Sequence, residues 1–151
     1  MKKVSKFTGR RASRFFTVQA LYQAEHSDQP LSFLIDGFIK EHLHDIDHNT
    51  AIKSDEVFFA DLMEGTWHHR DEIDNAIRKI LAEGWAIERL DEVVHAILRL
   101  GAYECLYTPE TPISVIVNEY LEVAKAFFSQ GEVTFIHVAL DNLGKMRTPP
   151  L

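Results

Sequence analysis

The stretch TPISVIVNEYLEVAKAFF, residues 111–128, decides the fold class. Apolar residues recur along it at intervals of three and four, which predicts a helix with two adjacent apolar stripes. The stripes consist of Ile113, Val117, Leu121, Ala124 and Phe128, and of Ile116, Tyr120, Val123 and Phe127. A helix with so little polar surface is either central in a helical core, which we favour, or shared with a partner. Thr111 is expected to cap it and Pro112 to open it.

Helical spacing continues on both sides of this stretch. Further helices are predicted over about 8–25, 31–43, 55–81 with a kink near Gly65, 87–107 and 132–146. Ser54 or Asp55 is expected to cap the third of these, and Gly101 should let a neighbouring helix come close. No segment shows a convincing alternation with a period of two. The predicted fold class is therefore all-α, a helical bundle of about six or seven helices.

The composition limits the class of protein. The 151 residues suit one domain, or two tightly packed halves, and a hydrophobic content of 46% supplies a core. No apolar run reaches the ~18 residues of a membrane span, and the first residues make a poor signal peptide. The single cysteine, Cys105, excludes an internal disulfide and lies on an apolar stripe, so we expect a buried structural thiol. We therefore expect a cytoplasmic protein.

The charge distribution is uneven. The net charge is −7, yet six basic residues and no acidic residue precede Glu25: Lys2, Lys3, Lys6, Arg10, Arg11 and Arg14. We call residues 1 to about 14 the basic arm. On a helix Arg10 and Arg14 share a face, and aromatic residues follow, as in proteins that bind single-stranded RNA. A solvated tail that aids solubility explains the same charges, so the arm alone leaves both readings open.

Other groups give weaker signals. His42, His44 and His48 lie in an acidic linker without a recognisable metal-ligand spacing, so a surface loop is expected there rather than a metal site. Glu119 and Glu122 lie one helical turn apart, but they lack a companion base or a catalytic motif and are read as a solvated face. The sequence therefore predicts no enzyme, no cofactor and no metal.

Three phenylalanines, Phe127, Phe128 and Phe135, gather around the break SQG. Exposed rings there would give a second surface for stacking bases. Buried rings would belong to the core.

Four segments together resemble the NusB family of transcription antitermination factors. They are RRASR…VQALYQ at 10–23, ILRLGAYE at 97–104, TPISVIVNEYLEVAKAF at 111–127 and TFIHVALD at 134–141. The resemblance extends over almost the whole chain. It implies a single NusB-like domain over residues 1–151, built from two perpendicular three-helix bundles, without enzymatic activity.

The resemblance also implies partners. Proteins of this family bind the boxA element of nascent ribosomal RNA leaders together with NusE, a small-subunit ribosomal protein. The pair helps to load a complex that keeps RNA polymerase reading through terminators. The basic arm would then meet RNA, and the acidic remainder could meet a basic ribosomal protein.

Site residues follow from the same resemblance. The RNA-binding residues would be Arg10, Arg11, Arg14, Tyr22, Lys125, Phe127 and Phe135. The partner-binding surface would follow the helix from about Glu88 to Glu104, with Glu88, Asp91 and Glu92 as acidic contacts. His137 and Val138 replace an amide and a glycine that are usual in the family, which puts a close backbone approach there in doubt. Ala12 interrupts the arm where some members have another arginine.

Two other functions fit parts of the sequence. Ribosomal RNA methyltransferases carry a NusB-like domain at their N-terminus, but this chain leaves no room for a methyl-donor-binding domain before Leu151. A helical adaptor that binds only protein is the second alternative. Titration with RNA, with and without the partner, separates it from the antitermination factor.

Overall fold

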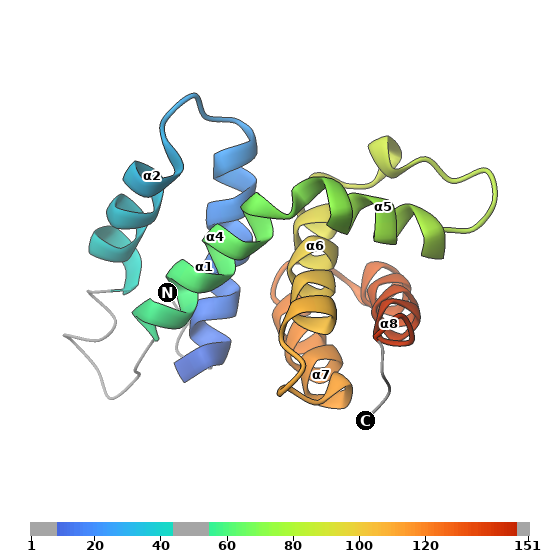
Figure 1. Ribbon diagram of the computed structural model, residues 1–151. Helices are drawn as coiled ribbons and strands as arrows, with labels where there is room; N and C mark the ends of the chain where they lie inside the picture. The colour runs from blue at the N-terminus through green and yellow to red at the C-terminus, as the bar shows by residue number, and fades with distance from the viewer. Residues whose placement is uncertain (1–8, 44–54, 148–151) are drawn as a thin grey trace. The chain divides into compact units, whose positions relative to one another are not determined.

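The structure is a computed structural model that describes residues 9–43 and 55–147. These ranges hold seven α-helices and no strand (Figure 1), which confirms the all-α class and the expected number of helices. The helices are α1 (Gly9–Glu25), α2 (Leu31–Phe38), α4 (Glu56–His68), α5 (Arg70–Ile80), α6 (Glu92–Tyr107), α7 (Ile113–Ala124) and α8 (Gln130–Gly144). Among the described residues, no helix combines the length and the apolar character needed to cross a membrane.

The chain forms two compact units, Met1–Trp67 and His68–Leu151. In the first unit α2 packs against α1 and continues as a π-helical turn, Ile39–Leu43. Ser13 Oγ ties α1 to the start of α4, because it donates to the carbonyl of Asp55 and accepts from its N–H, both at 2.8 Å. Asp55 Oδ1 accepts from the N–H of Phe58 at 2.9 Å, which confirms Asp55 as the cap of α4.

In the second unit α6 is the central helix, because it packs against α5, α7 and α8. Helix α7 lies within the stretch 111–128 from which the fold class was predicted. It is buried mainly along the side formed by Ile116, Val117, Tyr120, Val123 and Ala124, while Val115 is exposed. The expectation of a central position for this helix is therefore corrected. Gly101 confirms the predicted close approach, since a Cβ there would overlap the Leu140 side chain of α8.

Several helix boundaries differ from the predicted ones. The long helix breaks at His69 rather than near Gly65, since the His69 backbone (φ −100°, ψ 21°) leaves the helical region. Its ring stacks on Tyr107 at 4.2 Å between centroids and contacts Glu72 Oε1 through Nδ1 at 3.0 Å. At the other end of this unit, α7 starts behind Pro112 without a side-chain cap, so Thr111 does not cap it.

The helix predicted from residue 87 starts later. A short 3-10 turn, Ile87–Arg89, comes first, and Asp91 then caps α6 by accepting from the N–H groups of Val93 and Val94 at 2.8 and 3.1 Å. An Asp that caps in this way favours a fresh helix start over continuation of the preceding turn.

Buried polar groups hold the second unit together. Asp74 of α5 accepts from Arg99 of α6 through both carboxylate oxygens, at 2.9 and 2.6 Å, and His95 Nε2 lies 2.9 Å from Oδ1. Burial alone would raise the pKa of Asp74, but hydrogen bonds and charge from Arg99 and His95 outweigh it and hold the pKa well below its ordinary value. Cys105 is buried as expected, and burial raises the pKa of its thiol to about 12.

Arg147 is held by backbone carbonyls. Its guanidinium donates to the carbonyls of Glu104, Cys105, Thr108 and Thr111, at 2.7 to 3.2 Å. Arg147 therefore fixes the carboxyl end of α6 and the loop that follows.

Candidate nucleic-acid interface

The described part of the basic arm is the first turn and a half of α1. Phe58 of α4 lies beneath two of its arginines, with the guanidinium carbons of Arg10 and Arg14 at 4.5 and 4.9 Å from the ring centroid. Arg10 Nε also lies 3.8 Å from Asp55 Oδ2. The predicted arm residues Lys2, Lys3 and Lys6 lie outside the described residues.

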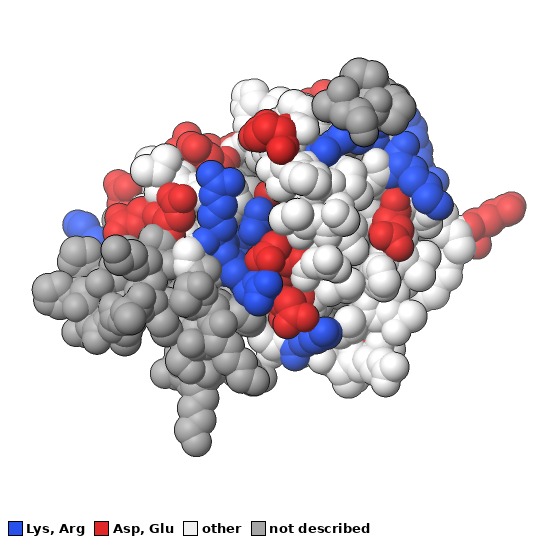
Figure 2. Space-filling view, turned by 90° about the horizontal axis from the view of Figure 1, so that it is seen from below, with Lys and Arg blue, Asp and Glu red and all other residues white. Residues whose placement is uncertain are grey.

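The three arginines differ in exposure. The Arg10 side chain is 59% exposed, and Arg11 is half-buried, whereas Arg14 is only 3% exposed. No acidic residue lies in the first turn of α1, so the positive end of the helix dipole adds to the arginine charge. Figure 2, which views the molecule from below, shows several separate groups of Lys and Arg side chains on this face, with acidic side chains between them. Among the described residues of the arm, Arg10 and Arg11 are therefore the arginines that solvent reaches.

Tyr22 is 41% exposed on α1, with its ring beside His26 at 4.8 Å between centroids. Eleven residues separate it from Arg11, which is close to three helical turns, so the two residues share a face about 16 Å apart. An exposed ring in line with a basic residue suits a nucleic-acid strand that follows the helix.

The other predicted RNA contacts belong to the second unit. Lys125 follows α7 and pairs with Glu122 at 2.9 Å while it remains exposed. The rings of Phe127 and Phe128 lie 6.4 Å apart, and the half-buried Phe135 of α8 contacts Trp85. Thus Phe135 is neither a fully buried core residue nor an isolated surface ring.

The residues that depart from the family pattern lie on α8. His137 Nε2 lies 3.4 Å from Asp141 one turn later, and Val138 is 56% exposed. At position 138, where the family usually has a glycine, the valine side chain is therefore on the surface, where it can hinder a ligand from approaching the backbone closely.

The predicted acidic contacts have different roles. Glu88 is exposed and lies 3.8 Å from Arg78, and Glu92 is exposed in the first turn of α6. Asp91 is exposed as well, but its carboxylate caps α6. Glu104, the far end of the predicted surface, is buried and accepts a hydrogen bond from Tyr120, so it cannot meet a partner directly.

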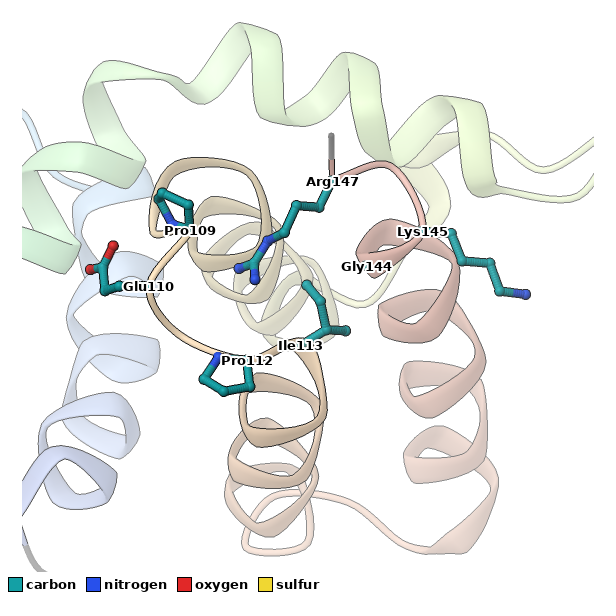
Figure 3. A pocket seen from close by; sticks show the side chains of 7 residues that line it. All are labelled: Pro109, Glu110, Pro112, Ile113, Gly144, Lys145 and Arg147. Atoms are coloured by element: carbon teal, nitrogen blue, oxygen red, sulfur yellow. The ribbon is translucent and has the colours of Figure 1, made fainter. Parts of the chain in front are cut away.

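One open cavity of about 750 Å³ lies where the loop between α6 and α7 meets the end of α8. It is lined by Pro109, Glu110, Pro112, Ile113, Gly144, Lys145 and Arg147, and Figure 3 shows Arg147 pointing toward that loop. The Arg147 guanidinium in this lining donates to four backbone carbonyls. Among the described residues no cluster of His, Cys, Asp and Glu is arranged to hold a metal; His44 and His48 lie outside them.

A model of the NusB family matches residues 11–145 of the chain. The chain belongs to the NusB family. The transcription antitermination protein NusB of Caulobacter vibrioides is 41% identical over 137 residues, which cover 90% of this chain and 92% of that protein. NusB of Sphingopyxis alaskensis is 42% identical over the same length and the same shares.

Solved structures share the fold. T. maritima NusB superposes with a TM-score of 0.76 at 28% identity and covers 93% of each chain. A NusB solved with NusE and double-stranded RNA superposes with a TM-score of 0.74 at 21% identity, over 89% of this chain and 95% of that one. The NusB fold is therefore present in this chain.

Sequence reasoning missed two aromatic residues, Phe58 in the first unit and Trp85 in the second. Nothing in the sequence indicates that two arginines of α1 contact the ring of Phe58. Trp85 lies in the segment AEGW, residues 82–85, which indicates the end of a helix and no binding role. The position of Trp85 directly after a glycine in a polar turn is a signal that could have indicated an exposed ring, because such turns lie on the surface.

Proposed function

We propose that this protein is an RNA-binding transcription antitermination factor. It binds boxA-type leader RNA of ribosomal transcripts together with NusE and supports read-through by RNA polymerase. The observation that carries the proposal is the match to antitermination proteins over 90% of the chain at 41% identity. The role is binding rather than catalysis, and it places the protein in the cytoplasm, where transcripts are made.

The geometry of α1 supports the RNA part of the proposal. Arg10 and Arg11 offer guanidinium groups at the positive end of a helix, and guanidinium groups bind phosphates bidentately. The buried Arg14 holds Phe58 and thereby the first turn of α4. We therefore assign phosphate contacts to Arg10 and Arg11 and a positioning role to Arg14.

Replacing Arg10 and Arg11 with alanine should weaken binding of a boxA-type single-stranded RNA by about tenfold or more at low salt. Each lost phosphate contact also removes about 0.7 from the slope of log K against log salt, so the slope should become shallower by about 1.4. Fluorescence anisotropy titrations at several salt concentrations measure both quantities, with and without NusE.

The matched control is Lys40→Ala with Lys145→Ala, which removes the same charge from two exposed positions outside α1. It should leave the affinity nearly unchanged. Equal losses in the two double variants would show that net charge alone matters, and an unchanged salt slope in the arginine variant would remove the arm from the interface.

The acidic side chains before and in the first turn of α6 should attract the basic partner. Glu88→Lys with Glu92→Lys should slow association with NusE about tenfold at low salt, and the difference should shrink at high salt. Asp91 is left unchanged because it caps α6. Stopped-flow kinetics give the association rate, with Asp61→Lys and Glu64→Lys on α4 as the control. If both double variants associate equally fast, the partner binds elsewhere.

A further inference from the structure

Three apolar side chains form a small exposed surface in the second unit. Trp85 is 56% exposed in the turn between α5 and the 3-10 turn, and its ring centroid lies 6.2 Å from that of Phe135. Val138, also exposed, follows Phe135 by one turn of α8. We call these three residues the Trp85 platform.

The turn holds Trp85 in place. Gly84 has a φ of 88°, a conformation that favours glycine, and the N–H of Trp85 donates to the carbonyl of Ala82 at 3.0 Å. Since α5 also packs against α8, both ends of the platform are fixed by the fold. A ligand would therefore cost little ordering of the protein when it binds.

The geometry of the two rings leaves room for a flat ligand. Their planes are inclined by 36°, so the rings meet at an angle and do not cover each other's faces. An exposed indole face offers a large stacking area for an aromatic molecule. Three apolar side chains are too few for the buried centre of a standard protein interface.

Charge around the turn is nearly balanced. Arg78, Lys79 and Arg89 exceed the acidic residues Glu83 and Glu88 by one charge, and Arg78 already pairs with Glu88. Binding at the platform must then depend on stacking more than on phosphate contacts. This separates the platform from the arginines of α1 in a salt titration.

We propose that Trp85 and Phe135 together bind an unpaired base of the RNA, with Trp85 as a base-stacking residue. The proposal rests on the RNA-binding function proposed above. Val138, the third residue of the platform, is exposed one helical turn after Phe135.

Fluorescence tests the contact directly, because the chain contains two tryptophans, Trp67 and Trp85. In Trp67→Phe, boxA-type single-stranded RNA should quench the emission of Trp85. In Trp85→Phe, where Trp67 is the emitter, the same RNA should leave the emission nearly unchanged. Unquenched Trp85 at an RNA concentration that saturates the protein by anisotropy overturns the proposal while the RNA-binding function stands.

Affinity provides the second test. Trp85→Leu should raise the Kd for this RNA roughly 5- to 150-fold without altering the salt slope, whereas Trp85→Phe should retain most of the affinity. Phe33→Leu, an exposed aromatic residue of α2, is the control and should bind as the wild type does. Thermal unfolding checks that each variant is folded.

Two further outcomes are decisive. If Trp85→Leu weakens binding of NusE but leaves RNA binding intact, the platform serves a protein and the proposal is wrong. If the wild-type protein binds no RNA with or without NusE, the proposed function fails and this inference fails with it.

Discussion

Asp74→Asn should lower the free energy of unfolding by roughly 3 kcal/mol at neutral pH, because it removes the carboxylate charge that accepts two hydrogen bonds from the largely buried Arg99 guanidinium. Asparagine has nearly the shape of aspartate, so the loss measures charge and hydrogen bonding more than packing. Chemical denaturation followed by circular dichroism gives the value. Asp71→Asn, an exposed acid in the first turn of the same helix, is the control and should cost far less.

The pH dependence identifies the cause of this loss. The pKa of Asp74 is lower in the folded chain than in the unfolded chain, where it is about 4. Its contribution is therefore complete above that value and is lost as the pH falls toward the folded pKa. The stability difference between wild type and Asp74→Asn should narrow as the pH falls from 4 toward 2. Parallel stability curves over this range would show that packing, not charge, causes the loss.

Arg14→Ala should also destabilise the protein, by roughly 2–4 kcal/mol. The variant removes a desolvated cation from the Phe58 ring and leaves a cavity where the buried stem of the side chain packs. Arg10→Ala, at the same ring but exposed, should cost no more than about 1 kcal/mol. Thermal and chemical unfolding compare the two variants.

The losses of RNA affinity in Arg10→Ala and Arg14→Ala should have the opposite order to their losses of stability. Per folded molecule, Arg10→Ala should weaken binding more than Arg14→Ala does, since a phosphate can reach only the exposed guanidinium. A larger loss of affinity in folded Arg14→Ala would show that Arg14 turns outward to contact RNA. In that case its position over Phe58 describes only the free protein.

The sequence predicted the helices well because each long apolar stripe needs a helical period to be buried. It predicted the ends of helices poorly where a single side chain determines the end. Asp91 caps α6, so this helix starts several residues after the expected point. At the break between α4 and α5, His69 contacts Tyr107, which is distant in the sequence, and Glu72, which is three residues away. Neither contact has a periodic signature.

The candidate site was predictable in residue type but not in exposure. A basic arm can be read from charge alone, yet Arg10 and Arg14 look equivalent in the sequence. Both contact the Phe58 ring, but Arg10 is exposed and Arg14 is buried, a difference that charge does not indicate. The partner of Phe135 was not predictable either, since Trp85 is fifty residues away and reaches α8 only through the packing of α5.

Two glycines constrain how this chain can change in evolution. Gly101 lies against Leu140, and Gly144 lies against Ile113, so α8 meets one neighbour at each of two positions where any Cβ would overlap a side chain. Every single-base change of a glycine codon that replaces the residue adds a Cβ at one of these contacts. A lineage that acquires alanine at position 101 must therefore move or shorten the side chain at position 140, and the same coupling links positions 144 and 113. Substitutions at these four sites should accumulate as pairs rather than singly.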